Sequence, residues 1–250
     1  MDGPAAAQRP VTGTPWLRRL GPGPAQDRLV CLPYAGGTGS AYRDWARWLP
    51  DGLGLWVADL PAREHRMLEE PVTDLDELIE VLAGELSESP RPTSLFGHSF
   101  GALVAFELAR RFPVRCLFVS GMAAPQTLVP RPAPADAEIL ADLRALGVAP
   151  ELLADPDLLE LVLPGIRADY AMAQGYRYRH GAPLTVPVYA LGGTADAQVP
   201  ASQLSGWAEQ TTGPCEVRTW AGGHLYLRDH AAGLSRFVAE RHLSSTGALS

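Results

Sequence analysis

A chain of 250 residues with 46% hydrophobic residues has the size and apolar content of one large globular domain. Its net charge of −7 argues against general binding to nucleic acid, and no apolar run reaches the ~18 residues of a membrane span. The three cysteines are scattered, which favours free thiols over disulfides or a metal site. Residues 1–25 are rich in Pro, Gly and Ala and lack the apolar stretch of a signal peptide, so we expect a flexible arm on a cytoplasmic protein.

From residue 28 onward, short apolar runs alternate with longer segments of helical periodicity. The runs are rich in Val, Leu and Phe and end at Gly or Pro, which predicts buried strands at 28–33, 55–61, 93–97, 114–121, 187–193 and 215–223. Apolar residues at helical spacing predict helices at 41–49, 74–86, 101–112, 202–210 and 231–243. This alternation predicts an α/β fold, with a mostly parallel sheet covered by helices on both faces.

Residues 122–183 interrupt the alternation, because they hold two helical patterns and no convincing strand. A connection of this length exceeds an ordinary crossover between parallel strands. Long inserts of this kind often cover a functional site. We therefore expect one domain over 26–250 with a helical lid at approximately 122–183. Tyr170 and Met172, in the second helical pattern, are candidates to line a pocket beneath it, although such a stripe also suits helix packing.

The segment FGHSFGA at 96–102 places Ser99 between Gly97 and Gly101, in a G-x-S-x-G pattern where a predicted strand meets a predicted helix. A sharp strand–turn–helix bend projects the serine hydroxyl from the carboxyl edge of the sheet, and small flanking residues let strand and helix approach closely. The pattern also arises by chance in Gly-rich chains. Its position between a strand and a helix predicts that Ser99 is a nucleophile.

A serine nucleophile needs a base, and hydrolases with this bend follow the chain order Ser…Asp…His. His224 follows the last predicted strand and two glycines that let its loop bend toward the serine. His98 adjoins Ser99, but its side chain should diverge from the hydroxyl. The other histidines lie in charged or helical surroundings without paired glycines: His65, His180, His230 and His242. We therefore predict that His224 is the base.

The predicted acid is Asp196, which follows the strand expected at 187–193. A carboxylate there can bond the imidazole, set its tautomer and stabilise its protonated form. The competitors are Asp155, Asp157 and Asp169 in the expected lid, and Asp229, which follows His224 too closely. A lone Asp in a Gly-rich turn is most often a turn former, but the chain order favours Asp196.

The Gly-rich loop at 33–37 follows the first predicted strand and is the expected source of an oxyanion-hole donor. It contains neither G-K-[ST] nor G-x-G-x-x-G, which argues against a phosphate-binding loop. The second donor is expected at the start of the helix that follows Ser99, where backbone N–H groups lack helical partners. We predict that the hole is formed by the backbone N–H groups of Ala35 and Phe100.

Together these segments resemble the type II thioesterases that accompany polyketide synthases and nonribosomal peptide synthetases, a family of α/β-hydrolases. The matching segments, in the family's order, are CLPYAGGTGSAYRDW, DLPAREHRMLEEP, LFGHSFGALVAFELAR, PVYALGGTAD and WAGGHLYL. The chain departs from the family's usual pattern at Tyr34, where His is common, and at Ala62, where Gly is usual.

The resemblance implies that stalled or wrongly primed short acyl groups are hydrolysed from the phosphopantetheine arm of carrier proteins, through an acyl-enzyme on Ser99. It implies no cofactor other than that arm and, as partners, acyl or peptidyl carrier protein domains, with no nucleic acid or membrane. We expect a monomer. Carrier proteins are generally acidic, so docking by this acidic chain would depend on apolar contacts or on arginines such as Arg63 and Arg66.

Three alternatives remain open at the level of the sequence. Two are enzymes, a chain-releasing thioesterase and a general carboxylesterase. The third is a carrier-protein-binding accessory subunit without catalysis. An intact set of Ser99, Asp196 and His224 argues against the third, because a binding subunit has no need of all three side chains.

Overall fold

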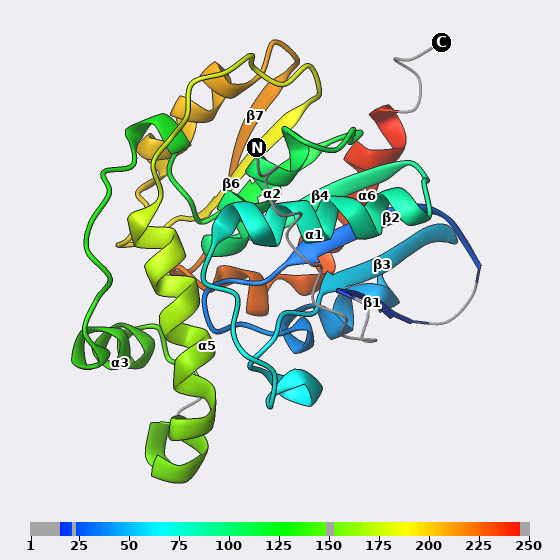
Figure 1. Ribbon diagram of the computed structural model, residues 1–250. Helices are drawn as coiled ribbons and strands as arrows, with labels where there is room; N and C mark the ends of the chain where they lie inside the picture. The colour runs from blue at the N-terminus through cyan, green and yellow to red at the C-terminus, as the bar shows by residue number, and fades with distance from the viewer. Residues whose placement is uncertain (1–15, 22–23, 149–152, 246–250) are drawn as a thin grey trace, which may run out of the picture.

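A seven-stranded, mostly parallel sheet forms the centre of the computed structural model, which describes residues 16–21, 24–148 and 153–245 (Figure 1). The strand order is β1-β3-β2-β4-β5-β6-β7, and β1 alone runs antiparallel to its neighbour. The strands are β1 (Leu17–Leu20), β2 (Ala25–Leu32), β3 (Gly52–Ala58), β4 (Thr93–His98), β5 (Leu117–Ser120), β6 (Val188–Gly193) and β7 (Cys215–Trp220). All six predicted strands are confirmed, as is the α/β class.

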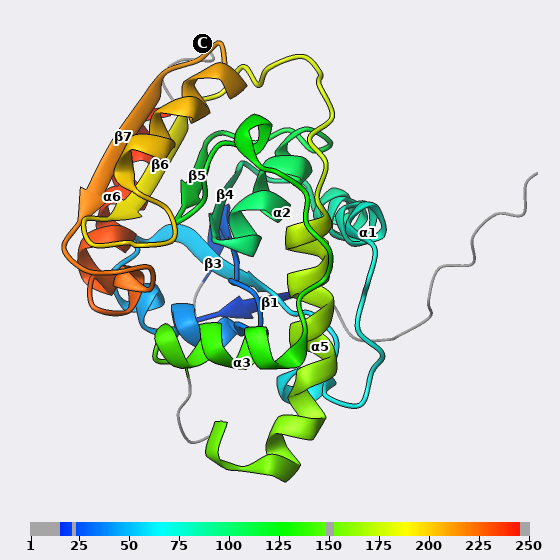
Figure 2. The ribbon, with the colours of Figure 1, turned by 90° about the vertical axis from the view of Figure 1, so that its left-hand side faces the viewer.

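Helices cover both faces of the sheet, as Figure 2 shows. One face carries α1 (Leu75–Glu88) and α2 (Phe100–Ala109), and the other carries α6 (Ala231–Ser244) and the 3₁₀ segment η1 (Gly39–Arg47). The 3₁₀ segment η4 (Ala201–Gln210) packs against β6 and β7. In β4, Leu95 joins the core cluster on the α2 face and Phe96 joins the cluster on the α6 face. Successive side chains of a strand point to opposite faces, so a strand covered on both sides is apolar throughout.

The outer strand β7 differs from the prediction in its burial. Its side chains are half-buried or exposed, and Val217 is among the exposed apolar residues. An edge strand has one neighbour in the sheet, here β6, and less cover than a central strand. The prediction of a strand at this position is confirmed, whereas the prediction that it is buried is wrong.

The expected flexible arm over 1–25 is wrong at Leu17–Leu20, which form the edge strand β1. Glu85 of α1 accepts hydrogen bonds from the backbone N–H groups of Trp16 and Leu17, at 2.9 and 3.2 Å. Arg18 forms ion pairs with Asp59 and Glu64. Partners far along the chain therefore order this strand, and four residues carry too little periodicity to predict it. Residues 1–15 lie outside the described residues.

In the segment where the sequence predicts a lid, the described residues include the helices α3 (Asp136–Ala145) and α5 (Pro156–Gly175) and a short 3₁₀ turn, η3 (Pro125–Thr127). They lie side by side in the lower part of Figure 2, and their shared core contains Ile139, Leu143, Leu163 and Ile166. Asp155 caps α5 by accepting from the backbone N–H groups of Asp157 and Leu158. This small core joins the two helices to each other, and α5 also packs against α2 of the main domain.

Cys31, Cys116 and Cys215 are free thiols, as expected. Among the described residues, no helix combines the length and the apolar character that crossing a membrane requires.

Candidate active site

Ser99 occupies the bend between β4 and α2 with a backbone conformation that L-residues rarely adopt. Its φ of 53° and ψ of −121° lie outside the ordinary helical and extended regions. The backbone holds it there, because the Ser99 N–H donates to Ser120 O at 2.8 Å and the Ser99 carbonyl accepts from the Ala102 N–H at 2.8 Å. Such strain costs on the order of 1–3 kcal/mol and is concentrated at functional sites. Ser99 is partly exposed, and no described residue hydrogen-bonds its hydroxyl.

The two glycines of the G-x-S-x-G pattern are required by the packing of backbone against backbone. A Cβ on Gly97 would lie 2.0 Å from the carbonyl oxygen of Gly101. A Cβ on Gly101 would lie 2.0 Å from the carbonyl oxygen of Leu32, at the end of β2. The prediction that these glycines allow strand and helix to approach closely is confirmed.

His224 and Asp196 form a buried hydrogen-bonded pair. Asp196 follows β6 and His224 follows β7, and His224 Nδ1 lies 2.8 Å from Asp196 Oδ2. The other carboxylate oxygen of Asp196 accepts from the backbone N–H groups of Gln198 and Val199, at 2.9 and 3.0 Å. Burial raises the pKa of Asp196, but the bonds from His224 and from these N–H groups outweigh it, so the pKa lies below its ordinary value. An ionised Asp196 requires Nδ1 to carry a proton, which leaves Nε2 of neutral His224 as an acceptor.

The His224 ring lies close to the backbone on which Ser99 is held. Its centroid is 5.0 Å from that of His98, the residue that precedes Ser99. A Cβ built on Gly121 would lie 3.2 Å from His224 Cε1, and Gly121 follows Ser120, whose carbonyl accepts from Ser99. The structure thus brings Ser99, His224 and Asp196 to the carboxyl edge of the sheet, where parallel sheets hold their ligands.

The predicted oxyanion-hole residues flank the close contact between Gly101 and the carbonyl oxygen of Leu32. Ala35 follows Leu32 in the loop after β2, and Phe100 precedes Gly101. The loop after β2 turns at Ala35 and Gly36, closed by a bond from the Gly37 N–H to the Tyr34 carbonyl at 2.7 Å. The Ala35 N–H has no acceptor among the described residues. Phe100 is the first residue of α2, so its N–H has no acceptor within the helix. Both N–H groups are therefore available for a bound oxyanion.

His98 has a role that its position in the sequence did not indicate. Its Nδ1 lies 2.8 Å from Ser120 Oγ, and that hydroxyl lies 2.6 Å from the hydroxyl of Tyr226. Burial, together with the nearby His224, lowers the pKa of His98 well below its ordinary value. His98 is therefore a neutral, buried support for the His224 ring.

A second Ser–His–Asp set lies at the opposite edge of the sheet. Ser94 Oγ is 2.7 Å from His242 Nδ1, and His242 Nε2 is 3.0 Å from Asp27 Oδ2. Ser94 and His242 are fully buried, and Ser94 lies within β4 rather than at a strained bend. This set fastens α6 to the sheet, which shows that the three residue types alone do not make a site.

Arg63 and Arg66, expected as docking arginines, are buried. Arg66 is 1% exposed, donates to the carbonyl of Asp59 and to Glu69, and stacks on Trp16. Arg63 is 8% exposed and forms a two-pronged ion pair with Asp169 of α5. The expectation is wrong because the acceptors Asp59 and Glu69 enclose the guanidinium group of Arg66, and the distant Asp169 pairs with that of Arg63.

A cavity of about 370 Å³ lies between the predicted lid and the loop that carries Ala35. Its wall is largely apolar and includes Tyr34, Met67, Leu143, Val162 and Ile166. Tyr170 and Met172 are absent from this wall. The Tyr170 hydroxyl donates to Asp142 of α3, and the Met172 side chain belongs to the main core.

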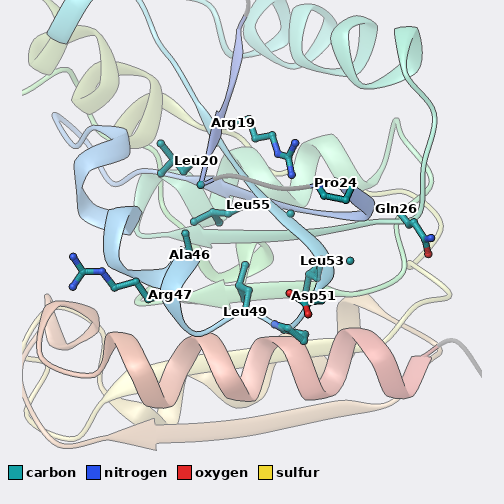
Figure 3. A pocket seen from close by; sticks show the side chains of 14 residues that line it. Arg19, Leu20, Pro24, Gln26, Ala46, Arg47, Leu49, Asp51, Leu53 and Leu55 are labelled. Atoms are coloured by element: carbon teal, nitrogen blue, oxygen red, sulfur yellow. The ribbon is translucent and has the colours of Figure 1, made fainter.

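A further cavity, of about 840 Å³, is shown in Figure 3, and none of Ser99, Asp196 and His224 lines it. Its lining includes Leu20, Asp51, Leu53 and Leu55, near the end of β1 and the start of β3. The catalytic candidates follow the carboxyl ends of parallel strands, so this cavity opens at the other edge of the sheet. The cavity of about 370 Å³ includes Tyr34, Gly36 and Gly37 of the loop that carries Ala35, and this position at the carboxyl edge of the sheet makes it the candidate substrate pocket.

The sheet, the strained serine and the His–Asp pair define a hydrolase of the α/β-hydrolase fold. Residues 27–241 match the family model of the thioesterase domain, and the chain belongs to this thioesterase family. The thioesterase PikA5 of Streptomyces venezuelae is 38% identical over 245 residues, which cover 93% of this chain and 87% of that protein.

Two further similarities narrow the class of thioesterase to those of biosynthetic pathways. The gramicidin S biosynthesis protein GrsT of Aneurinibacillus migulanus is 35% identical over 234 residues, 87% of this chain and 89% of that protein. The solved structure of the type II thioesterase BorB, from the borrelidin biosynthetic cluster, is 37% identical, with a TM-score of 0.83 over 93% of this chain and 99% of that chain. The predicted resemblance to type II thioesterases is confirmed.

Proposed function

We propose that this thioesterase hydrolyses short acyl groups from the phosphopantetheine arm of carrier proteins and so clears stalled or wrongly primed chains from a polyketide or peptide assembly line. The observation that carries the chemistry is the buried His224–Asp196 pair at 2.8 Å beside the strained Ser99. The similarity to thioesterases of biosynthetic clusters supports the choice of a carrier-bound thioester.

In the first half-reaction the Ser99 hydroxyl attacks the thioester carbonyl carbon while His224 Nε2 takes its proton. The oxyanion of the tetrahedral intermediate accepts hydrogen bonds from the N–H groups of Ala35 and Phe100. The carbon–sulfur bond then breaks, and the protonated His224 returns its proton to the departing thiol. The acyl group remains as an ester on Ser99.

In the second half-reaction His224 deprotonates a water molecule that attacks the acyl-serine ester. The bond to Ser99 Oγ breaks, the oxygen regains its proton from His224, and a carboxylic acid leaves. Asp196 remains ionised throughout and stabilises the imidazolium at each step. The proposed cycle uses no cofactor, since the phosphopantetheine belongs to the substrate protein.

The cavity under the lid supports a preference for short acyl groups. Its volume of about 370 Å³ is near the lower end of ordinary ligand pockets, and apolar side chains of α3 and α5 form part of its wall. Acetyl and propionyl groups are therefore the proposed substrates. Carrier protein domains are the proposed partners, with the enzyme acting as a monomer.

The test compares acetyl and propionyl groups loaded on a carrier protein with the same groups on a small thiol, using wild type and Ser99→Ala. Fast hydrolysis from the carrier that is lost in Ser99→Ala supports the proposal. Faster cleavage of simple esters than of loaded carrier would indicate a general carboxylesterase. Cyclised or full-length products would indicate a chain-releasing enzyme, and normal function of Ser99→Ala in the producing cell would indicate a binding subunit.

A further inference from the structure

Asp169 of the lid helix α5 reaches out of the lid and binds the loop that carries Ala35. It is 1% exposed, and its Oδ2 accepts the backbone N–H of Gly36 at 2.8 Å. The same carboxylate forms a bidentate ion pair with Arg63, and it accepts hydrogen bonds from Nη1 at 2.7 Å and from Nη2 at 3.0 Å. The residue next to the proposed oxyanion donor is therefore held by a charge on the lid.

Arg63 completes the hold on this loop. Its Nη1 also donates to the carbonyl oxygen of Gly37 at 3.3 Å, and its Nε donates to the carbonyl of Pro61 at 3.1 Å. Asp169 thus accepts a hydrogen bond from the Gly36 N–H, and Arg63 donates a hydrogen bond to the Gly37 carbonyl. With these two groups held, the turn has one orientation, in which the Ala35 N–H has no acceptor among the described residues.

The helix α5 packs closely against two loops, the one that contains Gly36 and the one that contains Arg63. The ion pair between Asp169 and Arg63 connects the same segments. Gly36 has a φ of +71°, and a Cβ there would lie 3.0 Å from Ile166 Cγ1 of α5. A Cβ on Gly165 of α5 would lie 2.9 Å from the carbonyl oxygen of Ala62, which precedes Arg63. The lid helix therefore rests directly on the Gly36 turn and on the segment that presents Arg63.

We propose that Asp169 and Arg63 are positioning residues that align the Ala35 N–H for catalysis, so that the oxyanion hole is complete only while the lid helix α5 is seated. The inference rests on the proposed function in one respect, that the Ala35 N–H stabilises the oxyanion. When α5 lifts, the Gly36 N–H and the Arg63 guanidinium lose their common acceptor, and the turn is free to rotate. Substrate entry and transition-state stabilisation are then coupled through one buried ion pair.

The lid contains a second ion pair that serves as a matched control. Arg167, two residues before Asp169 on α5, donates to Asp136 of α3 from Nε at 2.6 Å and from Nη2 at 2.5 Å. Both partners are exposed, and the pair joins the two lid helices without contacting the Ala35 loop. Asp136→Asn therefore perturbs the lid but leaves the loop contacts in place.

The experiment measures kcat and KM with propionyl-loaded carrier for wild type, Asp169→Asn, the double variant Arg63→Met/Asp169→Leu, and Asp136→Asn, together with the melting temperature of each. Replacing a whole buried ion pair with apolar residues often preserves stability, so the double variant separates folding from positioning. Loss of an oxyanion donor lowers kcat by about 100- to 1,000-fold, and a misaligned donor should lower it by roughly 10- to 100-fold.

We expect this loss of kcat in Asp169→Asn and in the double variant, with KM within about twofold of wild type because the donor acts in the transition state. The double variant should melt near the wild-type temperature, and Asp136→Asn should match wild type in kcat. A double variant with normal kcat would overturn the proposal, as would a change confined to KM. Wild type that fails to hydrolyse loaded carrier would refute the proposed function instead.

If the double variant does not fold, Arg63→Lys decides the question. Lysine keeps the positive charge but lacks the planar fork that reaches both Asp169 and the Gly37 carbonyl. The expected result is a lower kcat at unchanged KM and faster hydrogen exchange at the Gly36 amide. Wild-type kcat in Arg63→Lys would overturn the proposal.

Discussion

The imidazole ring of His98 packs against that of His224, with 5.0 Å between the ring centroids. Burial keeps the pKa of His98 well below its ordinary value, so this neighbour stays neutral when His224 takes a proton from Ser99. A charged neighbour at this distance would oppose the imidazolium that the mechanism requires. The bond between His98 and Ser120 holds the neutral ring in place.

The proposed role of Asp196 predicts a large loss of activity in Asp196→Asn. The amide would reverse the tautomer of His224 and remove the charge that stabilises its protonated form, so kcat should fall by about 10⁴-fold. Steady-state hydrolysis of propionyl-loaded carrier measures this effect. Asp229→Asn is the control, because Asp229 is exposed and follows His224 closely in the sequence. Comparable losses in both variants would contradict the assignment of Asp196.

Stability should fall as the pH drops below about 6.5. Burial lowers the pKa of both His98 and His242 from an ordinary value of 6.5. In this range the unfolded chain binds more protons than the folded chain, so acid favours unfolding, by up to about 1.4 kcal/mol per pH unit for each histidine. The stability is fully present above 6.5 and is lost as the pH falls toward the folded-state values.

Urea unfolding between pH 8 and pH 5 measures this dependence. His242→Gln removes one of the two buried groups and should flatten the slope, whereas His180→Gln alters an exposed histidine and should leave it unchanged. A slope that is the same in all three proteins would show that His242 does not contribute.

Gly101→Ala should prevent correct folding of the bend at Ser99. The added Cβ would lie 2.0 Å from the carbonyl oxygen of Leu32, and backbone cannot move aside as a flexible side chain can. Overpacking of this severity should cost about 3 kcal/mol or more. The matched variant Gly175→Ala places its Cβ in open space and should retain wild-type stability and activity. Thermal unfolding and thioester hydrolysis measure both variants. Wild-type melting temperature and activity in Gly101→Ala would contradict the prediction.

Tyr34→Ala should shift the acyl preference toward longer chains. Tyr34 lines the cavity, and its hydroxyl accepts a hydrogen bond from Arg228 at 2.9 Å. Removing the ring enlarges the apolar space, so the kcat/KM ratio of hexanoyl to propionyl carrier should rise by about tenfold. Tyr34→Phe keeps the ring and should keep the preference for propionyl. An unchanged ratio of kcat/KM for hexanoyl and propionyl carrier in Tyr34→Ala would show that the acyl group does not bind beside Tyr34.

The local features of this protein could be predicted from the sequence. Apolar periodicity located the strands, and the two glycines around Ser99 marked a bend in which Gly97 packs against Gly101, four positions along the chain. The hydrolase chain order selected Asp196 and His224 as partners for Ser99, and the structure brings all three residues to the carboxyl edge of the sheet. The strand and bend predictions succeed because the physical constraint acts mainly on neighbouring residues.

Tertiary structure alone decided the contacts between distant segments. Arg63 and Asp169 lie 106 positions apart. No local pattern in the sequence indicates that this loop arginine and this helix aspartate will be buried as an ion pair. The edge strand β1 is ordered by Glu85 and Asp59 rather than by its own residues. Ser94, His242 and Asp27 imitate a catalytic set but are enclosed by packing. Burial and pairing of charges depend on the closed fold as a whole, and this decides which polar residues act and which only hold the structure together.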